Sequence, residues 1–173
     1  MCKRYIIREA KVSEYFPLGE LMVQVYSQLE GFPKQDQIPD YYDYLRNVGD
    51  LTTFPKVKLF VAVSDYGSVD GGLVYYGDMK YYGAGEESTK NQIAGGFRLL
   101  AVHPQTRGKG LAKQLIDRCI KQARSEGFSQ LLIHSTKFMM IAWKMYERIG
   151  FKRFSEIDFE KGGVQVYGFR YVL

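Results

Sequence analysis

The stretch Gln105-Thr106-Arg107-Gly108-Lys109-Gly110-Leu111-Ala112 follows an apolar run, GGFRLLAVH, and opens a segment with apolar residues at helical spacing. The run predicts a strand and the spacing predicts a helix. A glycine-rich turn between them suits a pyrophosphate, because the first N–H groups of a helix have no intrahelical partner and the helix dipole adds positive charge. Its two glycines keep side chains away from phosphates, and Arg107 and Lys109 add charge. Alone, the pattern is a weak signal, since many such turns bind nothing.

The rest of the chain alternates strand and helix patterns, which predicts a mixed α/β domain. The expected strands are 3–11, 57–64, 71–76, 95–103, 130–135, 151–159 and 164–172. The expected helices are one from Ser13 to the Gly31-Phe32-Pro33 stop, one near 40–48, and those at 108–126 and 139–149. Residues 67–96 hold eight of the eighteen glycines and predict a hairpin with a long, mobile tip around 83–91.

Length and composition indicate one ordinary globular domain over residues 1–173, with 46% hydrophobic and 25% charged residues. No apolar run approaches the ~20 residues that span a bilayer. No apolar segment follows Met1-Cys2-Lys3-Arg4-Tyr5, so we expect no secretory signal. The only cysteines, Cys2 and Cys119, form no disulfide framework and favour a cytoplasmic location.

Positive charge is concentrated around the glycine turn. Residues 105–124 contain six basic residues and one acid, and so carry the whole net charge of +5. A compact positive segment beside such a turn favours a small polyanionic ligand over a nucleic acid, and a nucleic-acid binder is the least favoured hypothesis. The alternative is that Arg118, Lys121 and Arg124 form the solvated face of a helix.

Two linked motifs resemble the GCN5-related N-acetyltransferase (GNAT) superfamily. The first is Leu100-Ala101-Val102-His103-Pro104 followed by Gln105-x-x-Gly108-x-Gly110-x-Ala112, and the second is Ala142-x-x-x-Tyr146-x-x-x-Gly150-Phe151. The resemblance implies an α/β fold with a single mixed, mostly antiparallel twisted sheet of about six to seven strands, flanked by about four helices.

The resemblance also implies an acetyl-CoA site. Backbone amides of the turn would hold the CoA pyrophosphate, and the preceding strand would pair with the pantetheine arm. The residues implied to bind the cofactor are Leu100, Ala101, Val102, Arg107, Gly108, Lys109, Gly110, Leu111 and Ala112.

The resemblance implies that Tyr146 protonates the departing CoA thiolate. A phenol suits this task because its reference pKa of about 10 keeps it protonated at neutral pH. The alternative is that Tyr146 is a core aromatic. The family often places an amide where this chain has Met139, and no carboxylate occurs in 97–102 to act as a base.

The catalytic base is therefore open. His134 is our first choice, because its reference pKa of about 6.5 is near neutral, although a strand histidine satisfied by its neighbours fits equally. Asp78, Glu86 and Glu87 are alternatives that would act through water. Arg98 either binds an acidic group of the substrate or faces solvent.

Substrate signals are weaker than those for the cofactor. Seven of the fourteen tyrosines would flank the acceptor side, as a wall for an amine or as ordinary core: Tyr41, Tyr42, Tyr44, Tyr75, Tyr76, Tyr81 and Tyr82. We expect acetyl transfer to a primary amine of a small molecule or peptide, without a metal. A non-catalytic CoA-binding or interaction module is the alternative. Whether the chain forms a homodimer stays open.

Overall fold

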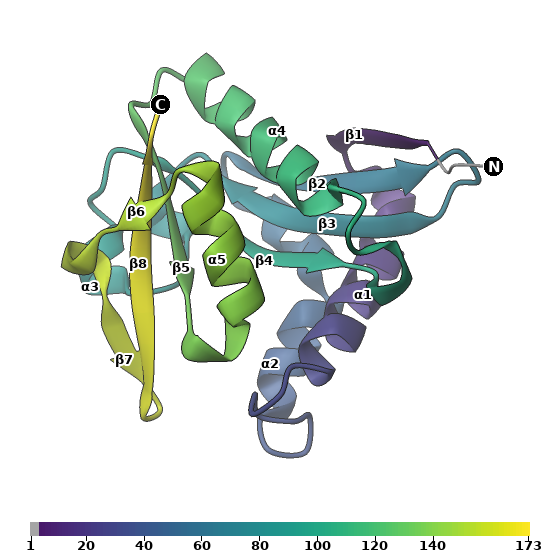
Figure 1. Cartoon of the computed structure of the whole chain (residues 1–173), viewed down its shortest axis with the longest axis horizontal. Helices are drawn as coiled ribbons and strands as arrows, with labels where there is room; N and C mark the ends of the chain where they lie inside the picture. The colour runs from purple at the N-terminus through teal and green to yellow at the C-terminus, as the bar shows by residue number, and fades with distance from the viewer. Residues whose placement is uncertain (1–3) are drawn as a thin grey trace. The chain divides into compact units, whose positions relative to one another are not determined.

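The computed structural model describes residues 4–173, which form two compact units. The first unit comprises the residues up to 74 and residues 99–118, and the second comprises residues 75–98 and 119–173. Figure 1 labels three elements that contribute residues to both units: strands β3 (Val69–Tyr76) and β4 (Gly95–Val102), and helix α4 (Leu111–Ser125). The division into units falls within each of them. The expected single domain over 1–173 stays a prediction.

The described strands form an eight-stranded sheet in the order β1-β2-β3-β4-β5-β8-β6, with β7 paired to β8. The remaining strands are β1 (Tyr5–Glu9), β2 (Val57–Ser64), β5 (Gln130–Ser135), β6 (Lys152–Arg153), β7 (Phe159–Lys161) and β8 (Val164–Val172). β4 and β5 pair in parallel, whereas β1 with β2 and β8 with its neighbours β5, β6 and β7 pair antiparallel. The predicted mixed, mostly antiparallel sheet is confirmed. The strand count exceeds the prediction because the 3-10 turn η6 (Ser155–Ile157) divides the segment expected as one strand.

Five α-helices occur in the described part of the chain. They are α1 (Tyr15–Ser27), α2 (Pro39–Arg46), α3 (Glu86–Thr89), α4 and α5 (Met140–Ile149). The other 3-10 turns are η1 (Val12–Glu14), η2 (Val48–Thr53), η3 (Met79–Tyr81), η4 (Pro104–Thr106) and η5 (Lys137–Met139). The tip expected to be mobile, around 83–91, contains α3. Thr89 closes α3, because its buried hydroxyl donates to the carbonyls of Ala84 (2.7 Å) and Gly85 (2.9 Å).

In the first unit, α1 buries Leu18 and Met22 completely, as their helical spacing predicts. Gly19 lets α1 approach α2, since a Cβ there would lie 2.1 Å from the carbonyl oxygen of Arg46. β1 runs antiparallel to β2, from the pair Tyr5–Ser64 to Glu9–Phe60. The guanidinium of Arg118 lies 4.4 Å from the centre of the Phe60 ring, so this basic residue of α4 packs on an aromatic side chain.

In the second unit, β4 and β5 diverge soon after they meet. The parallel ladder contains Gly95–Leu131 and Gly96–Leu132, and no further pair of these strands forms among the described residues. β5 instead keeps its full antiparallel pairing with β8, from Gln130–Val172 to Ser135–Tyr167. Within this unit, the C-terminal half of β5 therefore pairs with β8 and not with β4.

Cys119 is completely buried, and within residues 4–173 it forms no disulfide. Cys2 and Lys3, on which the cysteine argument and the start of the first expected strand rest, lie outside the described residues. None of the helices in residues 4–173 is long and apolar enough to cross a membrane.

Candidate active site

The glycine turn in the first unit joins η4 to α4. Gly108 and Gly110 have φ values of 78° and 75°, which residues other than glycine rarely adopt. The α4 ladder begins with the bond from the Gln114 N–H to the Gly110 carbonyl (3.1 Å), so the preceding amides lie ahead of the ladder. Arg107 and Lys109 are both exposed. The N–H of Arg107 donates to the Pro104 carbonyl (3.4 Å). The amides between it and the start of the ladder lie beside two exposed positive charges.

Backbone and side-chain hydrogen bonds fix the entry to this turn. The His103 N–H donates to the Asp70 carbonyl (2.8 Å), and the buried Thr106 hydroxyl donates to the His103 carbonyl (3.0 Å). An open pocket of about 350 Å³ lies beside it, lined by Ser68, Asp70, His103, Gln105, Thr106 and Lys109.

Leu99 has a strained backbone within β4. Its φ is 58°, in the left-handed region, and its side chain is only 5% exposed. Such a conformation costs on the order of 1–3 kcal/mol and is often found at functional sites. It comes directly before Leu100, the first residue of the segment that the family resemblance links to pantetheine.

Tyr146 lies in the second unit, on α5, and is 6% exposed. Its ring packs edge-on against Phe97 (6.0 Å) and Phe151 (5.8 Å). Burial, with smaller contributions from Tyr82 and Cys119, raises the pKa of Tyr146 well above its usual range. Among the described residues its hydroxyl makes no hydrogen bond. The phenol therefore keeps its proton at neutral pH and donates no hydrogen bond to another described side chain.

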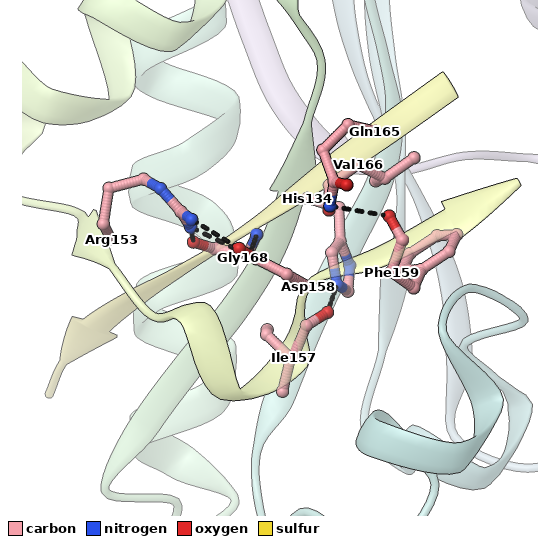
Figure 2. Close-up of polar contacts among 8 residues, drawn as sticks. All are labelled: His134, Arg153, Ile157, Asp158, Phe159, Gln165, Val166 and Gly168. Atoms are coloured by element: carbon pink, nitrogen blue, oxygen red, sulfur yellow. Dashed lines mark hydrogen bonds and ion pairs between the residues drawn. The ribbon is translucent and has the colours of Figure 1, made fainter. Parts of the chain in front are cut away.

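His134 uses both ring nitrogens. Nε2 lies 2.7 Å from the Ile157 carbonyl oxygen, a contact drawn as a dashed line in Figure 2. Nδ1 lies 3.1 Å from the Tyr82 hydroxyl. A carbonyl only accepts, so we assign the proton to Nε2, and Nδ1 accepts from Tyr82. Burial lowers the pKa of His134 to about 4, and the nearby charge of Arg98 adds to this. His134 is thus neutral at pH 7, and its lone pair faces Tyr82.

Tyr82 connects the two catalytic candidates. It is fully buried, donates to His134, and lies near enough to Tyr146 to raise the pKa of that phenol. Its carbonyl accepts a 2.8 Å hydrogen bond from Nη1 of Arg98. The sequence flagged Tyr82 only as one of several tyrosines, and nothing in it signals a contact with a histidine 52 positions away.

Residues 154–158, which we call the strap, position the Ile157 carbonyl. Arg153, beside the strap, forms a bidentate ion pair with Asp158, and Asp158 also accepts a 2.6 Å hydrogen bond from the Gly168 N–H (Figure 2). Arg153 also donates to the Gly168 carbonyl and lies 5.0 Å from the Tyr167 ring centre. The ion pair holds the pKa of Asp158 below its usual range, although burial opposes the shift.

Two of the three acids proposed as alternative bases, Asp78 and Glu87, have structural partners. Asp78 caps η3 by accepting from the Lys80 N–H (3.0 Å), and Glu87 pairs with Lys90 (3.1 Å). Glu86 is exposed in the first turn of α3.

Tyr75 and Tyr76 are completely buried, and the Tyr75 hydroxyl donates to Glu126 (2.7 Å). These two tyrosines therefore belong to the core.

Tyr41 and Tyr44 lie on α2 in the first unit, where their half-buried rings are 6.1 Å apart. Tyr42 is buried and donates to the Pro33 carbonyl (2.9 Å). In the second unit, Tyr81 is half-buried with Lys80 over its ring.

Two buried hydroxyls at the end of β5 also escaped the sequence analysis. The hydroxyls of Ser135 and Thr136 have no hydrogen-bond partner among the described residues. Thr136 is the N-cap of η5, yet its side chain does not cap the turn. Met139, where the family often has an amide, closes η5 by donating to the Thr136 carbonyl (3.0 Å).

The structure thus divides the predicted site residues between the two units. The cofactor-binding segments 100–102 and 107–112 belong to the first unit, whereas Tyr146 and His134 belong to the second. Within residues 4–173 no group of three or more His, Cys, Asp or Glu side chains is placed to hold a metal ion.

Comparison with known families gives the class to which this mixed sheet with its glycine turn belongs. A family model described as an acetyltransferase (GNAT) domain matches residues 69–173. The chain belongs to the GNAT acetyltransferase family.

Similar proteins carry related descriptions. The uncharacterized N-acetyltransferase YjgM of Escherichia coli is 41% identical over 59 residues, 34% of each protein. N-acetylaspartate synthetase of Danio rerio is 38% identical over 62 residues, 36% of this chain and 22% of that protein. These matches span about a third or less of the relatives' length.

Solved structures share the fold over nearly the whole chain. A GNAT-family acetyltransferase of Staphylococcus aureus superposes with a TM-score of 0.72 at 15% identity, over 95% of this chain and 98% of that one. PaiA N-acetyltransferase of Thermoplasma acidophilum, crystallised with coenzyme A, gives 0.72 at 13% identity, over 97% and 99%.

Proposed function

We propose that the protein is an acetyl-CoA-dependent N-acetyltransferase that transfers the acetyl group directly to a primary amine of a small molecule or peptide. The observation that carries this proposal is the glycine turn. It places two glycines at positive φ directly before a 15-residue helix, whose first N–H groups make no hydrogen bond within the helix. Two proteins of the same fold support the choice of cofactor, PaiA, crystallised with coenzyme A, and yncA of Salmonella typhimurium, described with its cofactor acetyl-CoA.

In this proposal the first unit binds the co-substrate. The amides of 107–112 hold the pyrophosphate, and the backbone of 100–102 pairs with the pantetheine arm. Arg107 and Lys109 add electrostatic attraction to the phosphates. The strained backbone of Leu99 then lies at the thioester end of the arm, where an altered direction of the peptide groups helps to polarise the thioester carbonyl.

The second unit supplies the proton transfers. The amine nitrogen forms a bond to the thioester carbon, the carbon–sulfur bond breaks, and Tyr146 donates its phenolic proton to the sulfur. The nitrogen must lose a proton, which becomes strongly acidic once the carbon–nitrogen bond forms. We assign this proton to His134 through the Tyr82 hydroxyl: Tyr82 passes its own proton to Nδ1 and takes the one from nitrogen. His134, with a pKa of about 4, is a weak base and can accept this proton only because the nitrogen is strongly acidic after the carbon–nitrogen bond forms.

Thermal unfolding tests the donor site first. The purified protein, shown to be free of cofactor, is unfolded with acetyl-CoA, CoA, ATP or no ligand. A ligand present at 100 times its Kd adds about 2.7 kcal/mol to the free energy of unfolding. We expect Tm to rise with both CoA species and not with ATP. No shift with either CoA species would overturn the proposal.

A non-catalytic CoA-binding module is the second candidate. Met139 and the lack of a carboxylate in 97–102 favour it. Tight binding of acetyl-CoA, without release of free CoA across a broad panel of amines, would support the module. Release of CoA that depends on an added amine would exclude it.

A further inference from the structure

Arg98 is a charged residue in an apolar strand, and its guanidinium has a fixed position. Gly96 and Arg98 lie on one face of β4, and a Cβ at Gly96 would come 3.0 Å from the Tyr82 ring. Nη1 of Arg98 donates to the Tyr82 carbonyl (2.8 Å), and the guanidinium carbon lies 5.6 Å from the centre of the Tyr82 ring. A Cβ at Gly83 would lie 3.1 Å from the same Nη1. The loop after η3 is therefore shaped around the guanidinium.

Aromatic side chains lie near Arg98. His134 shares Tyr82 with Arg98, and its ring lies 5.1 Å from that of Phe159. The charges that act on His134 are those of Arg98, Arg153 and Asp158. Arg153 and Asp158 neutralise each other in a bidentate pair, and His134 itself is neutral. The charge of Arg98 also acts on His134 and lies outside this ion pair, in a cluster that consists of Arg98, Tyr82, His134 and Phe159.

The place of Arg98 along β4 relates this cluster to the reaction. This step rests on the proposed function. With the pyrophosphate at 107–112 and the pantetheine arm running back along 102 to 100, the thioester lies at the Leu99–Leu100 end of the segment. Arg98 directly precedes Leu99 in the chain, and successive residues of a strand are about 3.3 Å apart. The acceptor amine must attack from this region.

We propose that Arg98 binds a carboxylate of the acceptor, so that the substrate class is primary amines that also carry a carboxylate, such as amino acids. A guanidinium recognises a carboxylate through two parallel N–H···O bonds, and these charge-assisted bonds are about twice as strong as neutral ones. The contact with Tyr82 fixes the orientation of the guanidinium plane before a ligand arrives, which reduces the entropy lost on binding.

Paired acceptors test this inference. Acetyl transfer is measured with amino acids and with the corresponding amino-acid amides, which lack the carboxylate charge. The proteins are the wild type, Arg98→Gln, Arg98→Lys and the control Arg148→Gln, which removes an exposed charge from α5 in the same unit. Comparing variants on one acceptor cancels the difference in amine basicity between acids and amides.

We expect Arg98→Gln to lower kcat/KM for the acids by about 10- to 100-fold and for the amides by less than about threefold, as loss of a charge-assisted bond predicts. Arg98→Lys should keep part of the preference, and Arg148→Gln should match the wild type. The Tm shift with acetyl-CoA should be the same in all four proteins, which shows that each is folded and binds the donor.

Two results would overturn the inference while leaving the proposed function standing. They are an equal loss of activity on acids and amides in Arg98→Gln, and a wild type that binds acetyl-CoA but acetylates no carboxylated amine. Absence of any Tm shift with acetyl-CoA in the wild type would instead overturn the proposed function.

Discussion

Tyr146 combines a retained proton with a position among buried rings. Its phenol has a raised pKa, and its ring is held by Phe97 and Phe151. Burial disfavours the phenolate, so the hydroxyl stays a proton donor throughout the neutral range. The same burial supports packing, and only kinetics separates the two roles.

Tyr146→Phe keeps the ring and removes the proton. We expect kcat to fall at least tenfold, because a positioned general acid contributes roughly 10²–10⁴-fold. The Kd for acetyl-CoA should be nearly unchanged. Tyr171→Phe, which removes the hydroxyl of another aromatic residue packed on Phe151, is the control and should keep full activity. Unchanged turnover in Tyr146→Phe would remove this phenol from the mechanism.

His134 predicts a pH dependence of stability. Its pKa is about 4 in the folded protein, against about 6.5 in an unfolded chain. The unfolded state therefore binds a proton first as the pH falls, and stability is lost between pH 6.5 and 4. Urea unfolding should show a falling midpoint over this range. His134→Asn, which keeps a donor and an acceptor, should flatten the part of the slope between pH 6.5 and 5.

NMR gives the direct check on His134. The ring should titrate near pH 4 and carry its proton on Nε2 at neutral pH. A midpoint near 6.5 would contradict both the burial and the Tyr82 contact.

At the scale of elements, the strap and β8 form one unit of packing. A Cβ at Gly168 would lie 2.2 Å from Cγ1 of Ile157 and 2.6 Å from the Phe154 carbonyl oxygen. Gly168 is also the β8 residue opposite His134 in the ladder, so strap, strand and histidine meet at one position. A change at Gly168 should therefore affect both stability and the state of His134.

Gly168→Ala is expected to lower the free energy of unfolding by about 1–3 kcal/mol through overpacking. It should also displace the Ile157 carbonyl and lower the pKa of His134 further, because the hydrogen bond to that carbonyl raises this pKa. Urea unfolding and NMR titration measure the two effects. Gly163→Ala, at the β7–β8 tip with nothing within 4 Å, is the control. It should cost roughly 1 kcal/mol of backbone strain and leave the pKa of His134 unchanged. An unshifted His134 in Gly168→Ala would show that the strap does not set its environment.

At the scale of the whole molecule, the positive charge is uneven, and residues 105–124 carry the net +5. Attraction between exposed charges is screened at high ionic strength. We expect the Kd for CoA to rise severalfold from about 0.05 M to 0.5 M salt. The double variant Arg107→Gln/Lys109→Gln should bind more weakly at low salt and approach the wild type at high salt. Lys161→Gln, at the β7–β8 hairpin, is the control. Equal salt dependence in the double variant would place the phosphates elsewhere.

Local sequence patterns predicted most of the fold. The helix expected at 139–149 begins one residue later, and the strand at 164–172 has the expected bounds. The glycine turn was predicted because neighbouring residues determine both its backbone and its charge. The segment 151–159 was predicted wrongly, since the contact of the strap with Gly168 divides it, and that contact joins distant residues.

The acceptor side of the site could not be predicted in this way. The contacts of His134 with Tyr82 and Ile157, and of Arg98 with Tyr82, join segments separated by 16 to 52 positions. Leu99 gives no local signal either, because leucine does not favour a positive φ. Patterns of spacing within one element carry no information on such pairings.

The chain passes between the two units three times, after residues 74, 98 and 118. No continuous fragment therefore contains the first unit without part of the second. A protein truncated to the region matched by the family, 69–173, would lack β2, the neighbour of β3 in the sheet. Its β3 would become an unprotected edge strand, open to pairing with other copies. Truncation should thus yield aggregates, whereas co-expression of the missing residues 1–68 as a separate chain should restore a folded protein.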